Sequence, residues 1–157
     1  MEQEDAAMED DAAMHRAQAI AANNSVWELL DAESPDVTEV LSRAYAASYH
    51  WARAADRAAE NSARAAWLLS RCHAVLGHGE LALHHADECA AVVAEAGLRD
   101  FDLGYAHEAR ARALAALGRD DEARIELTAA RSVEVADADD RQIFESDLTS
   151  PPWFGLA

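Results

Sequence analysis

Residues 66–83 read AWLLSRCHAVLGHGELAL and residues 109–124 read ARARALAALGRDDEAR, and the two stretches repeat one order of features. In each, apolar side chains recur at helical spacing up to a Leu-Gly pair, Leu76-Gly77 or Leu117-Gly118, and a second helical run follows. Glycine just beyond the last apolar position is a typical helix end. The repeat therefore predicts two helical hairpins, in units over residues 63–97 and 102–136.

The composition predicts helices in the rest of the chain as well. Of the 157 residues 51% are hydrophobic, many of them alanine, and only six are Gly and three Pro. Helical spacing begins near Ala12, breaks at Ser34-Pro35, where Ser34 is the expected cap of the next helix, and returns over residues 137–148. We therefore expect an all-α fold of antiparallel helical hairpins in a stack, with about six to seven helices.

The expected domain spans residues 12–148. Residues 1–11 carry six acidic side chains and little to bury, which predicts a disordered acidic tail. Residues 149–157 form a C-terminal tail in this prediction. Its apolar pair Trp153-Phe154 either folds back on the domain or stays exposed, and folding back is the default.

The hairpin pattern resembles the tetratricopeptide repeat. The resemblance depends on Gly77 with Ala82 and on Gly118 with Ala123, where a glycine ends one helix and a small residue lets the next helix pack closely. The glycines lie 41 positions apart (118 minus 77), more than the family's period of about 34. The resemblance implies a short right-handed solenoid. A second resemblance, to a group of short actinobacterial proteins with no assigned activity, depends on the phrases Tyr49-His50-Trp51, Leu69-Ser70-Arg71, Leu83-His84-His85-Ala86 and Asp100-Phe101-Asp102.

The resemblance further implies an inner face that could bind a ligand. Carried over position by position, this face presents Arg64, Trp67 and Arg71 from one unit and Tyr105, Glu108 and Arg112 from the next. Arginine binds carboxylates in a bidentate manner, and Trp and Tyr supply amphipathic contact area. We expect a groove for a protein or peptide segment, acidic or C-terminal in character. The alternative is that these arginines pair with neighbouring carboxylates.

The net negative charge of the chain restricts the kinds of partner that it can bind. The chain carries 30 Asp and Glu residues against 13 cationic residues, a formal net charge of −17. Such a surface repels nucleic-acid phosphates and anionic membranes, so neither is an expected partner. The acidic start lacks the features of a signal peptide, and two cysteines make no disulfide framework, so a cytoplasmic location is expected. A homodimer through exposed apolar ends of the stack is a further expectation.

Histidines suggest a second class of function. His85 and Cys89 are four residues apart on one helical face, and His73 could approach them from the antiparallel helix, a set that would suit Zn or Cu. The sequence contains no complete metal-binding signature, and a buried thiol is the plainer explanation of Cys89. No cofactor is therefore the first expectation, with Zn or Cu as the alternative.

A candidate pocket lies at Tyr49, His50 and Trp51, where a titratable ring stands beside two large aromatic side chains. No catalytic motif is present, so no catalytic residue is assigned. The first hypothesis is an interaction module that is not an enzyme. The alternative is a small-molecule or metal-binding protein, an enzyme among the options, that uses His50, His73, His85 and Glu108.

Overall fold

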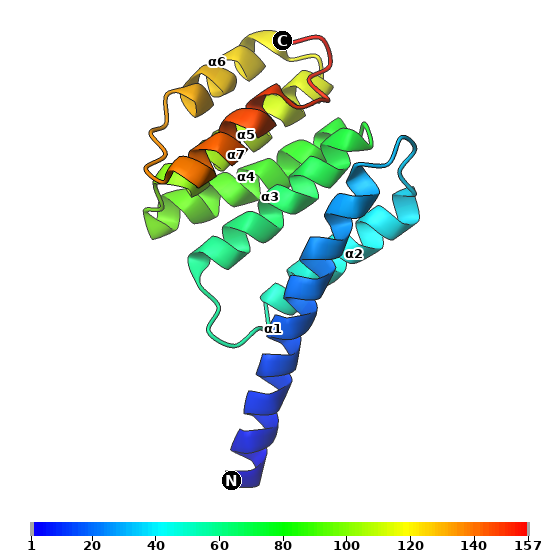
Figure 1. Ribbon diagram of the computed structural model, residues 1–157, viewed down its shortest axis with the longest axis vertical. Helices are drawn as coiled ribbons and strands as arrows, with labels where there is room; N and C mark the ends of the chain where they lie inside the picture. Colours follow the sequence, from blue (N-terminus) through cyan, green and yellow to red (C-terminus); the bar gives the residue numbers. More distant parts are fainter. Residues whose placement is uncertain (1, 157) are drawn as a thin grey trace.

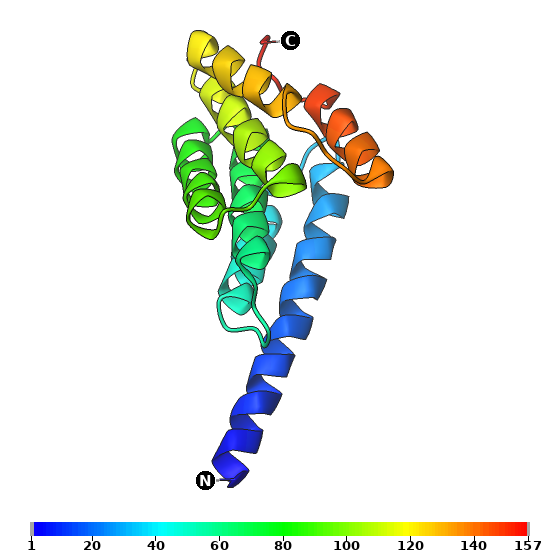
Figure 2. The same ribbon diagram turned by 90° about the vertical axis from the view of Figure 1, so that its left-hand side faces the viewer.

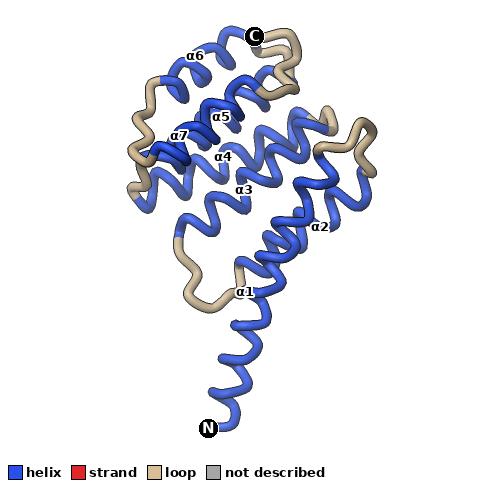
Figure 3. Tube along the Cα trace, in the orientation of Figure 1, coloured by secondary structure: helices blue, strands red, loops and turns tan. Residues whose placement is uncertain are grey.

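The computed structural model describes the backbone of residues 2–156 and the side chains of residues 6–156. This part of the chain is all-helical (Figure 3). The helices are α1 (Glu2–Leu30), α2 (Val37–Trp51), α3 (Ala59–Val75), α4 (Gly79–Ala96), α5 (Asp100–Ala116), α6 (Asp120–Arg131) and α7 (Ala138–Thr149). The predicted all-α class is confirmed.

The helices form three antiparallel hairpins, α1–α2, α3–α4 and α5–α6, that stack in chain order (Figure 1). Between hairpins, α3 packs on α2 and α5, and α4 packs on α5. The last helix, α7, has no hairpin partner and packs against α5 (Figure 2). The predicted stack of helical hairpins is therefore present, and both predicted repeat units correspond to hairpins within it.

Glycine ends the first helix of both predicted hairpins. Gly77 follows α3 with φ +76°, and Gly118 follows α5 with φ +71°. A side chain is strained at such φ values, whereas glycine adopts them freely, so the chain can turn sharply into the next helix. The turn signals in the sequence are local, which is why the hairpin positions could be predicted.

The N-terminal prediction needs correction. Residues 2–11 are the first turns of α1 rather than a stretch without regular structure, and this end of the helix extends beyond the hairpin stack (Figure 1). Alanine and glutamate are strong helix formers, and acidic side chains are favourable near a helix N-terminus. The predicted ends of both tails, Met1 and Ala157, lie outside the described residues. No described helix combines the length and apolar character that a bilayer crossing requires.

The structure changes two further boundaries of the prediction, the start of α2 and the end of the domain. Asp36, not Ser34, caps α2, because its carboxylate accepts a hydrogen bond of 2.9 Å from the backbone N–H of Glu39. At the other end, residues 150–156 fold back on the stack, so that Trp153 and Leu156 are buried in the core beside α5. This outcome confirms the default, and it makes much of the predicted C-terminal tail part of the domain.

Candidate functional site

A cleft of about 500 Å³ opens on one face of the stack, bordered mainly by α1, α3, α5 and α7. These are the first helices of the three hairpins and the last helix of the chain. Its walls hold five aromatic side chains, those of Trp27, Trp51, Trp67, Phe101 and Tyr105. Polar groups border it too, from Asn23, Asn61, Arg64, Asp102 and Asp147.

Trp67 connects the aromatic rings of the cleft. Its ring centroid lies 5.4 Å from that of Trp27 and 4.7 Å from that of Tyr105. Tyr105 continues the contact to Phe101 at 4.6 Å. Tilted and edge-to-face contacts at these distances are favourable, and they join α1, α3 and α5. The cleft therefore has a preformed aromatic wall.

Arg64 is the exposed cation of the cleft. Its guanidinium group donates two hydrogen bonds to the Asp102 carboxylate, at 2.8 and 3.1 Å, and these bonds raise the pKa of Arg64. The same group lies 5.5 Å from the ring centroid of Phe101. About half of the Arg64 side chain is exposed. Arg64 therefore could still contact a ligand from within its ion pair.

The other two predicted groove arginines are not available to a ligand. Glu108, 1% exposed, accepts hydrogen bonds from Arg71 at 3.1 Å and from Arg112 at 2.6 Å. Its second oxygen accepts one from the Trp67 indole N–H at 2.8 Å. Arg71 is 8% exposed and Arg112 is 1% exposed. The expectation that these guanidinium groups would bind an acidic peptide is therefore wrong, and internal pairing, the stated alternative, holds for both.

The C-terminal segment completes the environment of Arg112. The guanidinium group donates to the carbonyl oxygens of Asp147, Ser150 and Pro152, at 2.8 to 3.0 Å. The Trp153 ring lies over it, with its centroid 4.0 Å from the guanidinium carbon. Burial lowers the pKa of Arg112, and Glu108 opposes that effect. Residues 147–153 thus occupy the position at which a foreign peptide was expected.

The predicted binding residues divide into two groups. Arg64, Trp67 and Tyr105 line the cleft, whereas Arg71, Glu108 and Arg112 form the buried ion network beside it. Tyr105 itself is 5% exposed and donates a hydrogen bond of 2.5 Å to Asp147, and its burial raises its pKa. The sequence analysis did not assign Trp27 or Phe101 to the site, because their positions depend on packing between separate hairpins.

The three residues of the candidate pocket, Tyr49, His50 and Trp51, do not all line the same cavity. Trp51 lines the aromatic cleft. His50 instead contacts α1, where the two Nδ1 atoms of His50 and His15 are 2.7 Å apart. Tyr49 is about half exposed, and its ring centroid lies 3.8 Å from the guanidinium carbon of Arg53. His50 and Tyr49 thus belong to the α1–α2 contact rather than to the cleft.

A continuous chain of hydrogen-bonding contacts joins His78, His73, Tyr45 and His85 and ends at Glu88. Nδ1 of His78 and Nδ1 of His73 are 3.2 Å apart, and Nε2 of His73 is 3.0 Å from the Tyr45 hydroxyl. That hydroxyl is also 3.2 Å from Nε2 of His85, whose Nδ1 lies 2.6 Å from the Glu88 carboxylate. Burial, with smaller effects of His85 and His78, lowers the pKa of His73 to about 4. The His73 ring is therefore neutral at neutral pH.

The structure brings together only part of the predicted metal set. His73 and His85 meet at Tyr45, but Cys89 packs with Ala63, Ala66 and Val93 and lines the aromatic cleft. Burial raises the pKa of Cys89 to about 12, so the thiol stays protonated. Its packing contacts support the plainer explanation of a structural thiol.

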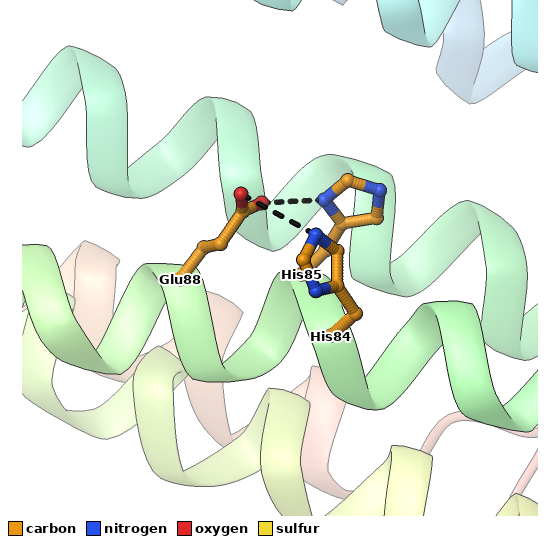
Figure 4. A group of neighbouring side chains, drawn as sticks. All are labelled: His84, His85 and Glu88. Carbon is orange, nitrogen blue, oxygen red and sulfur yellow. Dashed lines mark hydrogen bonds and ion pairs between the residues drawn. The ribbon is translucent and has the colours of Figure 1, made fainter.

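A different group of donors converges on α4. Ligand atoms of His84, His85 and Glu88 all lie within 4.8 Å of one another (Figure 4). The sequence analysis missed His84 and Glu88. The available signal was their spacing, since positions 84 and 88 are one helical turn apart and can therefore share a face.

Comparisons with known proteins assign no relative. No protein-family model matches the sequence. No curated protein matches it, and no solved structure matches it either. The residues and the geometry of the cleft are therefore the basis of the functional argument.

Proposed function

We propose that this chain is a helical-repeat interaction module that binds a segment of a partner protein in the aromatic cleft. The observation that carries the proposal is the cleft itself, about 500 Å³ lined by five aromatic rings from successive hairpins. Tryptophan and tyrosine dominate binding energy at many interfaces because they bury large areas with little loss of conformational freedom. The resemblance to tetratricopeptide repeats agrees with this use of the face.

The negative charge of the chain as a whole favours a basic partner segment. Arg71 and Arg112 are buried around the shared Glu108 and are not accessible to a ligand, and Arg64 is paired with Asp102. Asp147 also borders the cleft, and the whole chain has a formal net charge of −17. Electrostatic complementarity speeds encounter and discriminates between partners. The proposed partner therefore offers an apolar or aromatic anchor side chain with Arg or Lys residues beside it.

A phage-displayed library of random peptides, panned against the purified chain, tests this proposal. Enriched peptides are expected to share an apolar or aromatic residue flanked by basic residues. Synthetic copies should change the tryptophan fluorescence, because three of the chain's four tryptophans line the cleft. Affinity is then measured by titration of the chain into labelled peptide.

Two exposed isoleucines provide matched variants. Ile143 on α7 borders the cleft and is 54% exposed, whereas Ile125 on α6 is 69% exposed and is absent from the cleft lining. Ile143→Asp should weaken peptide binding at least about tenfold, equivalent to about 1.4 kcal/mol, and Ile125→Asp should leave it unchanged. Equal binding by wild type and Ile143→Asp, or enrichment of acidic peptides alone, would count against the proposal.

A small organic molecule is the second candidate ligand for the same cleft. The volume is the observation that favours it, since pockets for small ligands are typically about 300 to 1,000 Å³ and mostly apolar. Native mass spectrometry of the purified chain detects such a molecule as an added mass. A bound mass that Ile143→Asp removes and that peptide does not displace would support this second function over the first.

A further inference from the structure

The donor group on α4 is compact and lies partly in solvent. Nδ1 of His85 is 2.6 Å from one carboxylate oxygen of Glu88, and Nε2 of His84 is 3.5 Å from the other (Figure 4). His85 is nearly buried, with 8% of its side chain exposed, whereas the side chains of His84 and Glu88 are 63% and 51% exposed. Packing thus restricts the His85 ring, whereas the exposed side chains of His84 and Glu88 can rotate toward it.

The spacing of these donors suits one metal ion. Two ligand atoms at about 2.1 Å from a tetrahedral Zn²⁺ lie about 3.4 Å apart. The 2.6 and 3.5 Å separations bracket that value, and rotation of the exposed Glu88 and His84 side chains can adjust both. Two imidazoles and one carboxylate are a known three-residue zinc set that leaves the fourth position to water. Imidazole donors favour Zn²⁺, Co²⁺ or Ni²⁺ over Ca²⁺ and Mg²⁺, which prefer oxygen.

His85 also has the supporting contact that a metal-binding histidine needs. If Nδ1 of His85 binds the ion, Nε2 carries the ring proton. Its N–H can then donate a hydrogen bond to the Tyr45 hydroxyl, 3.2 Å away. The hydroxyl can in turn donate to Nε2 of His73 at 3.0 Å. Such outer contacts fix the ring orientation and tautomer of a metal ligand. Tyr45 comes from α2 and His73 from α3, so the support comes from two other helices.

We propose that His84, His85 and Glu88 bind a divalent transition-metal ion of the Zn²⁺ class, with Tyr45 and His73 as positioning residues. The inference is independent of the aromatic cleft, which none of the three ligands lines. It replaces Cys89 of the sequence-based set with His84 and Glu88, and moves His73 from ligand to support.

A second histidine–carboxylate pair provides the control. Nδ1 of His107 lies 2.7 Å from Glu126, much as His85 lies from Glu88. The other Glu126 oxygen accepts a hydrogen bond from Arg110 at 2.8 Å, so a cation already occupies the position that His84 has in the proposed site. His107→Gln therefore removes a comparable ion pair without removing a proposed ligand.

Zinc binding to the full chain, purified without a histidine tag and stripped with a chelator, is measured by calorimetry with ZnCl₂ alone. Wild type is expected to bind one Zn²⁺ per chain. His84→Gln and Glu88→Gln should each weaken binding at least about tenfold, equivalent to about 1.4 kcal/mol, while His107→Gln should bind as wild type does. All three positions are on the helix surface or partly exposed, so folding is expected to persist.

Each contrary result overturns the assignment. Absence of Zn²⁺ binding by wild type would remove the site. Wild-type affinity in both His84→Gln and Glu88→Gln would remove it as well. Loss of binding in His50→Gln with retention in His84→Gln would place the ion at the His15–His50 contact instead, where two Nδ1 atoms are 2.7 Å apart.

Tyr45→Phe tests the positioning residues. Tyr45 is 43% exposed, but its hydroxyl is the hydrogen-bond partner of the buried His73, so Tyr45→Phe should fold and melt only a few degrees below the metal-free wild type. Zinc affinity should fall by about 10- to 100-fold, the range seen when outer contacts of metal ligands are removed. The absorption spectrum of bound Co²⁺ should change as well. Unchanged affinity and an unchanged Co²⁺ spectrum would show that Tyr45 does not position His85.

Discussion

The guanidinium carbon of Arg112 lies 4.0 Å from the ring centroid of Trp153, across the boundary between α5 and the folded-back C-terminal segment. The Nε atom of the same guanidinium group donates a hydrogen bond of 2.6 Å to Glu108. A charge that is 1% exposed is thus held between a carboxylate, three backbone carbonyls and an aromatic face. Cation–π contacts are strongest where water is excluded, as it is here. The contact holds the C-terminal segment against α5.

Trp153→Ala should therefore destabilise the chain strongly. The substitution removes a side chain that is 7% exposed and uncovers Arg112, and loss of a buried tryptophan costs about 3–5 kcal/mol. The adjacent Phe154, 44% exposed, is the matched control, and Phe154→Ala should change stability by less than about 0.5 kcal/mol. Urea unfolding followed by circular dichroism compares the two. Equal stability of the two variants would show that the Trp153 contact contributes little.

Glu108→Gln should be among the most destabilising isosteric substitutions in the chain. It leaves Arg71 and Arg112 buried without their shared carboxylate, and breaking a buried ion pair costs about 3–5 kcal/mol. Glu39 on α2, 54% exposed and paired with Arg43, is the control, and Glu39→Gln should cost less than about 1 kcal/mol. Thermal and chemical unfolding measure both. A Glu108→Gln protein as stable as Glu39→Gln would contradict the charge network described above.

Gly104→Ala should be destabilising even though it lies inside a helix. An added Cβ would be 2.7 Å from Cζ of Phe144, so the substitution would push α7 away from α5. Overpacking of this kind costs about 1–3 kcal/mol, against a gain of up to about 1 kcal/mol in helix propensity. In a Phe144→Ala background the clash is gone, so Gly104→Ala should then stabilise. A double-mutant cycle by urea unfolding measures this reversal of sign, and its absence would refute the steric explanation.

Alkaline pH should weaken the fold through Cys72. Burial raises the pKa of this thiol from its ordinary value of 9.0 to about 12. The unfolded chain therefore loses the thiol proton from about pH 9 upward while the folded chain keeps it, so the free energy of unfolding falls as pH rises from 9 to 12. The stabilisation is fully present below pH 9. Unfolding free energies across this range should fall less steeply for Cys72→Ala than for wild type, and parallel curves would contradict the prediction.

The fold was largely predictable because its signals are local. Helical spacing and the Leu-Gly pairs at Gly77 and Gly118 act within a few residues, and the hairpins appear where these signals predict them. The N-terminal tail was mispredicted although its signal is local as well. Its acidity masked a run of alanine and glutamate with high helix propensity.

The site was only partly predictable because its contacts are long-range. Trp27 contacts Trp67, and Arg112 meets carbonyl groups 35 to 40 positions later in the sequence. Helical spacing places Arg64, Arg71 and Arg112 near one face, but it does not reveal which carboxylate or carbonyl group lies opposite each of them. All three arginines meet carboxylates of the chain, but only Arg64 is half exposed, and the spacing could not predict that difference.

The fold-back of residues 147–153 has a consequence for biosynthesis. During translation the hairpins α1–α2, α3–α4 and α5–α6 can each begin to form as their residues leave the ribosome. The guanidinium group of Arg112, however, gains the carbonyl groups of Ser150 and Pro152 only after about 40 more residues have been added. Until then Arg112 keeps its bond to Glu108 but lacks these carbonyl groups and the Trp153 ring, and the last hairpin exposes an apolar end. Final closure is therefore a late event, and stalling before Ser150 would leave a nascent chain open to chaperones.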